Sequence, residues 1–122
     1  MNPYLNAYRR VTADADTPAK RLNEVFERCI LECRRAKDLI EKKDAAGKGS
    51  AINRAVDLVS ELLAALDRDL APELCERLSG LYLFVLTRLG DANIKFTVEP
   101  VDDAIRILES LKDAFWEAAK SQ

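Results

Sequence analysis

The chain contains no histidine among its 122 residues. This absence excludes a Ser-His-Asp triad, a Cys-His pair and a phosphotransfer histidine. It also excludes a di-iron bundle, which takes a Glu-x-x-His motif from each of two helices. Three cysteines alone supply too few ligands for a structural zinc site. We therefore expect no catalytic residue, no cofactor and no metal site, and a protein that is not an enzyme.

The sequence also lacks long apolar runs and an excess of one charge sign. No stretch approaches the ~20 apolar residues of a membrane span, and the N-terminus lacks the apolar core of a signal peptide. The 19 basic and 21 acidic residues give a net charge of -2, whereas a nucleic-acid binder needs a basic face. An odd number of cysteines fits a reducing cytosol. These features predict a cytoplasmic protein that binds no nucleic acid and inserts into no membrane.

What is present is a set of apolar residues that recur at steps of three and four. They predict four helices, over about residues 18–43, 50–66, 74–95 and 101–119. The predicted seam of the first helix consists of Leu22, Phe26, Cys29, Cys33, Ala36 and Ile40, and its two cysteines are expected to be small core residues. The predicted stripe of the fourth helix consists of Val101, Ile105, Leu108, Leu111 and Phe115. Four helices joined by short links predict an all-α fold, an antiparallel up-down bundle of four helices over residues 17–122.

Polar residues and prolines predict where these helices begin. Thr17 is a candidate N-cap, with Pro18 at the first helical position. Ser50 is expected to cap the second helix, because residues 45–49 contain two glycines and are predicted to break the chain. Asp69 is expected to cap the third helix.

Residues 1–16 carry no sustained apolar period and predict an N-terminal arm that docks on the domain. Tyr4, Leu5, Tyr8 and Val11 are its sizeable apolar groups. A disordered tail is the alternative reading of this stretch.

The third helix contains six consecutive apolar residues, 81–86, which cover every side of it. At about 100° per residue, its core stripe is predicted to run through Leu74, Leu78, Leu81, Val85, Leu89 and Ala92. Leu83 then points away from the stripe, and Phe84 and Leu86 flank it. Either this helix is buried nearly all round, or it offers a second apolar surface. Other apolar residues that lie off the helix seams are Leu31, Leu39, Leu58 and Ile107.

The block Leu78-Ser79-x-Leu81-Tyr82, followed by Arg88-Leu89-x-x-Ala92-Asn93, is similar to the flagellin export chaperones, the FliS family. The resemblance covers most of the chain and is best over residues 36–118. Asn2-Pro3 and Ala7-Tyr8 also resemble the N-terminus of that family. The family usually opens its first helix with a nearly all-apolar run that ends in a Leu-Tyr-Asp-Gly-like block. In this sequence Arg21, Asn23 and Glu24 replace apolar positions of that run, and Arg28 replaces the glycine.

The resemblance implies a cytosolic helical bundle without enzymatic activity. It implies binding of the disordered C-terminal segment of flagellin, protection of flagellin against premature polymerisation, and delivery to a component of the flagellar export gate. Tyr8 matches the family's N-terminal tyrosine, which implies that the arm docks at the export gate or covers the client groove. The predicted client-binding residues are Leu58, Tyr82, Leu83, Phe84 and Leu86.

Two alternatives stay open beside the flagellin chaperone. One is a homodimeric adaptor or structural bundle, whose spare apolar surface is its own dimer interface. The other is a chaperone for a different exported subunit. A chaperone is expected to be a monomer or weak homodimer that binds its client one to one, whereas an adaptor buries its patch in a permanent dimer.

Overall fold

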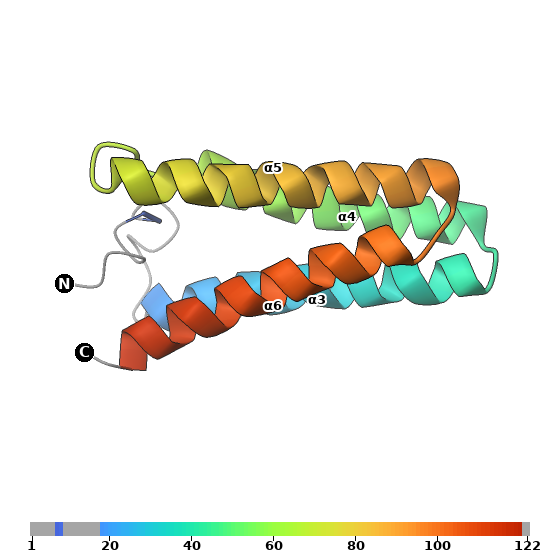
Figure 1. Cartoon of the computed structure of the whole chain (residues 1–122). Helices are drawn as coiled ribbons and strands as arrows, with labels where there is room; N and C mark the ends of the chain where they lie inside the picture. The colour runs from blue at the N-terminus through green and yellow to red at the C-terminus, as the bar shows by residue number, and fades with distance from the viewer. Residues whose placement is uncertain (1–6, 9–17, 121–122) are drawn as a thin grey trace.

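The computed structural model describes residues 7–8 and 18–120. Four helices account for nearly all of them: α3 (Pro18–Glu41), α4 (Ala45–Ala64), α5 (Pro72–Lys95) and α6 (Glu99–Lys120). They run alternately up and down along one axis (Figure 1). Within the described residues there is no strand, so the predicted all-α bundle of four helices is confirmed.

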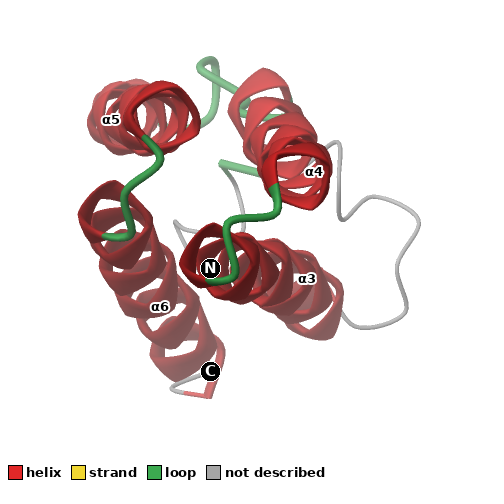
Figure 2. Cartoon of the chain, turned by 90° about the vertical axis from the view of Figure 1, so that its right-hand side faces the viewer, coloured by secondary structure: helices red, strands yellow, loops and turns green. Residues whose placement is uncertain are grey.

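Viewed along its axis, the bundle has one helix at each corner of a square (Figure 2). α3 packs against α4 and α6, and α5 packs against the same two helices. α3 and α5 therefore lie on a diagonal, and the pairs that include α3 are packed more extensively than those that include α5. The side of the bundle formed by α3 and α4 faces away from the side formed by α5 and α6.

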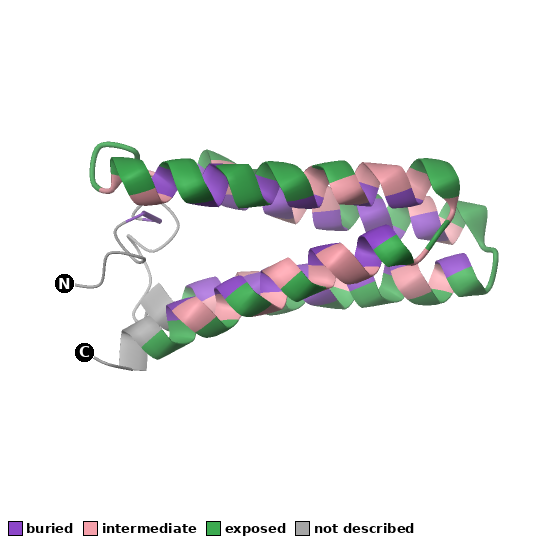
Figure 3. Ribbon diagram, viewed as in Figure 1, coloured by how far each residue is buried: buried purple, intermediate pink, exposed green. Residues whose placement is uncertain are grey.

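Buried residues lie on the sides of the four helices that face the inside of the bundle (Figure 3). The predicted seam of α3 is buried along its whole length, including the two cysteine thiols at positions 29 and 33. In α6, Val101, Leu108 and Phe115 are buried as expected, while Ile105 is half-buried. The period of three and four thus located the core of these two helices correctly.

α4 begins five residues before the predicted start at Ser50. Asp44 is the N-cap, and its carboxylate accepts a hydrogen bond from the backbone N–H of Gly47 at 2.9 Å. Lys43 has a φ of 61° and makes the tight turn out of α3. The expected chain break at residues 45–49 is therefore wrong: a cap at Asp44 stabilises a helix by about 1 kcal/mol, which offsets part of the low helix propensity of the two glycines.

α5 begins with Pro72 in its first turn, but Asp69 does not cap it. The N-cap position is Ala71, which makes no side-chain capping hydrogen bond. The backbone N–H of Asp69 instead donates to the carboxylate of Asp67 at 3.2 Å, which shapes the preceding turn. At the other end, Phe96 adopts a left-handed conformation and closes the helix by donating to Ala92 O at 2.9 Å.

The core stripe of α5 differs from the predicted one at two positions: Leu74 is half-buried where its neighbour Cys75 is fully buried, and Leu81 is exposed where Tyr82 is buried. Leu81 is 39% exposed, whereas its neighbour Tyr82 is fully buried. On a helix these two residues lie on opposite sides of the row that joins Leu78 to Val85, so the period alone does not choose between them. Tyr8 packs on the Tyr82 side and decides the choice.

The described part of the N-terminal stretch is Ala7 and Tyr8, and both are fully buried. The backbone N–H of Asp67, in the turn between α4 and α5, donates to Ala7 O at 2.8 Å. The rest of the predicted arm, and the candidate cap at Thr17, lie outside the described residues. None of the four helices is both long and apolar enough to cross a membrane, a statement that covers residues 18–120.

Candidate binding surface

The middle of α5 carries no charged residue between Arg77 and Arg88. Three large apolar side chains stand exposed in this interval: Leu81 is 39% exposed, Leu83 53% and Phe84 46%. We call these three residues the α5 outer surface. Several exposed large apolar side chains within about one turn of a helix, rather than a single one, favour an interaction site over an ordinary solvated helix.

Polar contacts with α6 and α4 show which side of α5 faces each neighbour, and therefore where Leu81, Leu83 and Phe84 lie around the helix. Arg88 donates to the carboxylate of Asp103 on α6, with Nη2 2.9 Å from Oδ2. Asn93 O, on the other flank, accepts from Lys48 Nζ on α4 at 2.9 Å. With 100° per residue, Leu81 and Phe84 fall on the α6 flank with Arg88, while Leu83 falls near the outermost line of the helix.

The predicted client residues on α5 do not all lie on this surface. Leu83 and Phe84 are exposed. Leu86 is half-buried and packs against the core, so it lies at the edge of the α5 outer surface and is not part of it. Tyr82 is fully buried, and placing it among the surface residues is corrected here.

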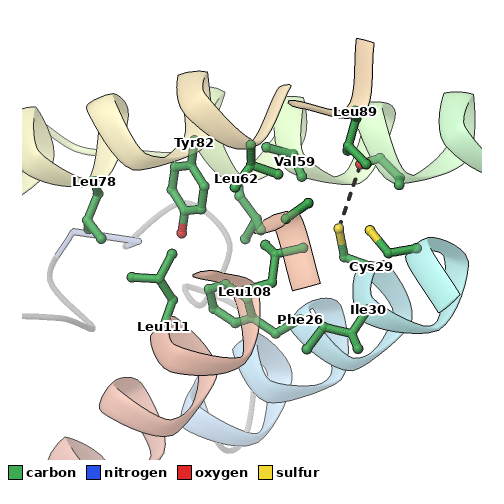
Figure 4. Close-up of a cluster of buried hydrophobic side chains, with 14 of the residues drawn as sticks. Phe26, Cys29, Ile30, Val59, Leu62, Leu78, Tyr82, Leu89, Leu108 and Leu111 are labelled. Atoms are coloured by element: carbon green, nitrogen blue, oxygen red, sulfur yellow. Dashed lines mark hydrogen bonds between the residues drawn. The ribbon is translucent and has the colours of Figure 1, made fainter. Parts of the chain in front are cut away.

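Tyr82 points from α5 into the bundle, toward the cluster that holds Leu62, Leu111 and Phe26 (Figure 4). Its hydroxyl shares a hydrogen bond with the hydroxyl of Tyr8. The Tyr8 ring meets Phe115 of α6 edge-on, with ring centroids 5.0 Å apart. Burial raises the pKa of Tyr82 far above its ordinary value, so the phenol stays neutral in the folded protein.

Leu58 is separated from the α5 residues. It is half-buried on α4 and lines a hollow of about 250 Å³ together with Leu31 and Glu32 of α3. This hollow therefore lies between α3 and α4. Figure 2 shows that these two helices form the side of the bundle that faces away from α5 and α6. The structure thus divides the predicted client residues between two sides of the molecule.

Five exposed large apolar residues of the described part of the chain were not assigned to a site from the sequence: Leu31, Leu70, Leu81, Ile94 and Trp116. Leu81 was placed in the core, because the period of α5 fits it as well as Tyr82. Leu31 lies off the seam of α3, a signal that the sequence does carry, and it is 63% exposed. Ile94, near the end of α5, is also exposed, but a single apolar residue next to Lys95 gives no clear signal.

Nothing in the described residues suggests a metal site. Residues 7–8 and 18–120 contain no group of three or more histidine, cysteine or acidic side chains that could hold an ion. Cys29, Cys33 and Cys75 are free and buried in the core. The pKa of the Cys29 thiol is raised by its hydrogen bond with Cys33 and by burial, which keeps it protonated and unreactive.

Comparison with known proteins gives a consistent result over the whole chain. The sequence model of one family, described as Flagellar protein FliS, matches residues 1–122. The chain is 26% identical to a Flagellar secretion chaperone FliS of Campylobacter jejuni, covering 96% of this chain and 91% of that protein. It is 24% identical to the protein of that name from Salmonella typhimurium, over 91% of this chain and 86% of the relative. The relative of that name from Bacillus subtilis is 26% identical, with all of this chain and 90% of the relative covered.

Proposed function

The chain belongs to the FliS family of flagellar proteins, and from that premise we propose that it is a cytoplasmic flagellar secretion chaperone. Its client is the disordered C-terminal segment of flagellin. Binding keeps flagellin from polymerising before export and delivers it to a component of the export gate. The protein acts by binding alone and catalyses no reaction.

The observation that carries this proposal is the α5 outer surface. A disordered segment loses conformational entropy when it folds on a partner, so it needs extensive apolar contact in return. Leu81, Leu83 and Phe84 offer such contact on one helix, with no charged group between residues 78 and 87. An amphipathic client helix can lay its apolar face along them, in the manner of other helix-in-groove complexes.

Tyr8 contributes to export-gate docking in this proposal, as the family resemblance implies. Because its ring is fully buried against Phe115, it reaches a partner only after residues 7–8 leave the core. Release of the segment also uncovers Tyr82, which is the one way in which Tyr82 joins the client contact. In this proposal, release of Tyr8 both allows docking at the export gate and exposes Tyr82 to the client, so the two binding events are linked.

A homodimeric adaptor would use the α5 outer surface differently, as a contact between two copies. Light scattering across a hundredfold range of concentration separates the two functions. The chaperone is expected to stay a monomer or a weak, concentration-dependent dimer. A stable dimer at every concentration, combined with no client binding, would favour the adaptor.

Titration calorimetry tests the proposal directly. The probe is a synthetic C-terminal flagellin segment from the organism that carries this chain, and the matched control is a segment of equal length from the flagellin N-terminus. We expect one-to-one binding of the C-terminal segment, with an increase in helix content by circular dichroism. Binding of neither segment would contradict the proposal. Binding of C-terminal segments from other exported subunits in place of flagellin would redirect it to a different client.

A further inference from the structure

The turn between α4 and α5, residues 65–71, is where the bundle meets residues 7–8 through the main chain. Figure 1 shows this short segment, drawn in blue, at the end of the bundle where α4 turns into α5. The backbone N–H of Asp67 donates to Ala7 O at 2.8 Å. Asp67 O accepts a hydrogen bond from the thiol of Cys75 on α5, with Sγ 3.4 Å away. The turn therefore fixes the direction of the Asp67 N–H, and with it the position of Ala7.

Arg68, the next residue of the turn, joins it to α5 a second time. Its Nη2 atom donates to Ser79 Oγ at 2.7 Å. Ser79 is only 8% exposed, and a buried hydroxyl costs free energy unless it forms a hydrogen bond. The charged donor makes this bond stronger than one between two neutral groups. Arg68 therefore holds the turn against α5, one residue away from the contact between Asp67 and Ala7.

Ser79 and Tyr82 are three residues apart, so they lie on the same side of α5, one above the other. Both are buried. Tyr82 meets the N-terminal segment directly, because its hydroxyl shares a hydrogen bond with that of Tyr8. Ser79 is connected to the same segment through Arg68 and the turn. α5 is therefore linked to residues 7–8 at two points, one direct and one through the turn.

We propose that Arg68 and Ser79 are positioning residues that hold the α4–α5 turn in place for Ala7 and so determine how often residues 7–8 leave the core. Without their hydrogen bond, the turn loses a side-chain link to α5, and the Asp67 N–H can move away from Ala7 O. The segment is then held less firmly and is released in a larger fraction of the molecules.

The consequence for the client rests on the proposed function, in which Tyr82 joins the client contact only after residues 7–8 are released. A site that is available in only a fraction of the molecules has an apparent affinity lowered by that fraction. A looser turn raises the fraction and is therefore expected to strengthen client binding. If Arg68 and Ser79 served folding stability alone, their removal would weaken client binding or leave it unchanged.

A contact of the same kind at the opposite end of α5 supplies the matched control. Lys48 Nζ, from α4, donates to Asn93 O at 2.9 Å and lies 4.3 Å from the centre of the Phe96 ring. Lys48 thus joins a cation to α5 as Arg68 does, but far from the turn. Lys48→Met removes this charged donor and is expected to leave the contact between Asp67 and residues 7–8 unchanged.

Hydrogen exchange of the Asp67 amide, followed by NMR on the full chain, measures the docking of residues 7–8, because this amide is bonded to Ala7 O. We expect about fivefold faster exchange in Arg68→Ala and in Ser79→Ala, the factor that one ordinary hydrogen bond represents. The double variant should exchange no faster than either single variant, because the two residues form one contact. Arg68→Lys, which keeps a charged donor, should restore part of the protection.

Titration calorimetry of the same variants with the C-terminal flagellin segment tests the regulatory consequence. Arg68→Ala and Ser79→Ala are expected to bind the segment up to about fivefold more tightly than the wild type, in proportion to the larger released fraction. Lys48→Met is expected to show neither faster exchange at Asp67 nor tighter client binding.

Each contrary result has a separate meaning. If the Asp67 amide exchanges at the wild-type rate in both alanine variants, or equally fast in Lys48→Met, the positioning role is wrong and the proposed function stands. Faster exchange with unchanged or weaker client binding would contradict the regulatory consequence. If the wild-type protein does not bind the flagellin segment, the proposed function and that consequence fail, while the exchange rates still decide whether Arg68 and Ser79 hold the turn.

Discussion

α3 and α5 are both 24 residues long and occupy diagonal corners of the bundle, but they differ in what they present to solvent. The exposed side of α3 is charged along its length, with Leu31 as its single large apolar residue. The exposed side of α5 is charged only toward its ends and apolar in its middle. A charged outer face is stable in water without a partner, whereas the middle of α5 is suited to be covered.

The inner faces of the two helices also differ in what covers them. α3 is packed more extensively against α4 and α6 than α5 is. Tyr8 packs beside Tyr82 of α5 and against Phe115 of α6, so it adds to the burial between these two helices. α5 is thus the helix that depends on the N-terminal segment for its burial and that keeps an apolar surface for a partner.

The largest expected effect separates the inner from the outer face of α5. Val85 is fully buried, so Val85→Asp places an unpaired carboxylate in the core, at a cost of several kcal/mol, and should unfold the domain. Leu83→Asp, two residues away, is expected to change the free energy of unfolding by less than about 1 kcal/mol. Thermal melts followed by circular dichroism measure both. If both variants destabilised the protein equally, Leu83 would lie in the core, and the contrast drawn between the exposed sides of α5 and α3 would not hold.

The second effect concerns the dependence of α5 on Tyr8. Tyr8→Ala is expected to lower the free energy of unfolding by about 3 kcal/mol, because it removes a fully buried ring. Tyr8→Phe keeps the ring and is expected to cost about 1 kcal/mol, the scale of one hydrogen bond. Urea unfolding gives both values. A Tyr8→Ala variant as stable as wild type would show that this segment is not part of the core in solution.

The third effect is a dependence on pH. Burial raises the pKa of Tyr82 above its ordinary value of 10.0, so above about pH 10 the unfolded chain ionises this phenol while the folded protein does not. Its contribution to stability is complete below pH 10 and is lost above it, by up to about 1.4 kcal/mol for each pH unit. Melting curves between pH 8 and pH 11 should therefore fall more steeply for wild type than for Tyr82→Phe.

The buried thiols of Cys29 and Cys75 also have raised pKa values and act in the same direction. Both proteins contain them, so only the difference between the two curves reports on Tyr82. Parallel curves would mean that Tyr82 is accessible to solvent, which would extend the exposed part of α5 to its inner side.

The sequence was sufficient for the fold class because each helix carries a sustained apolar period. The seam of α3 was correct at every position, from Leu22 to Ile40. The start of α4 was missed because two glycines suggested a break, whereas the N-cap at Asp44 determines the boundary. A local capping contact of this kind has a weaker sequence signal than a helix seam.

The candidate site could be predicted only in part. Leu83 and Phe84 were expected at the surface from their angle on the helix, and they are exposed. Tyr82 and Leu81 were exchanged, because the contact with Tyr8, 74 residues away in sequence, leaves no trace in the period of α5. Leu58 was grouped with the α5 residues because the sequence does not show which neighbour each flank of α4 faces; the flank of Leu58 faces α3.

The most direct test of the α5 outer surface is titration calorimetry of the C-terminal flagellin segment with Leu83→Ser and Phe84→Ser, alongside thermal melts of the same variants. Both side chains are about half exposed, so the melts should shift little. Each change should weaken client binding by about 1–2 kcal/mol, the scale of a large apolar side chain removed from a contact. Leu70→Ser serves as the control and should leave binding unchanged. Unaltered client affinity in both serine variants, or a large drop in their melting temperatures, would contradict the assignment of this surface.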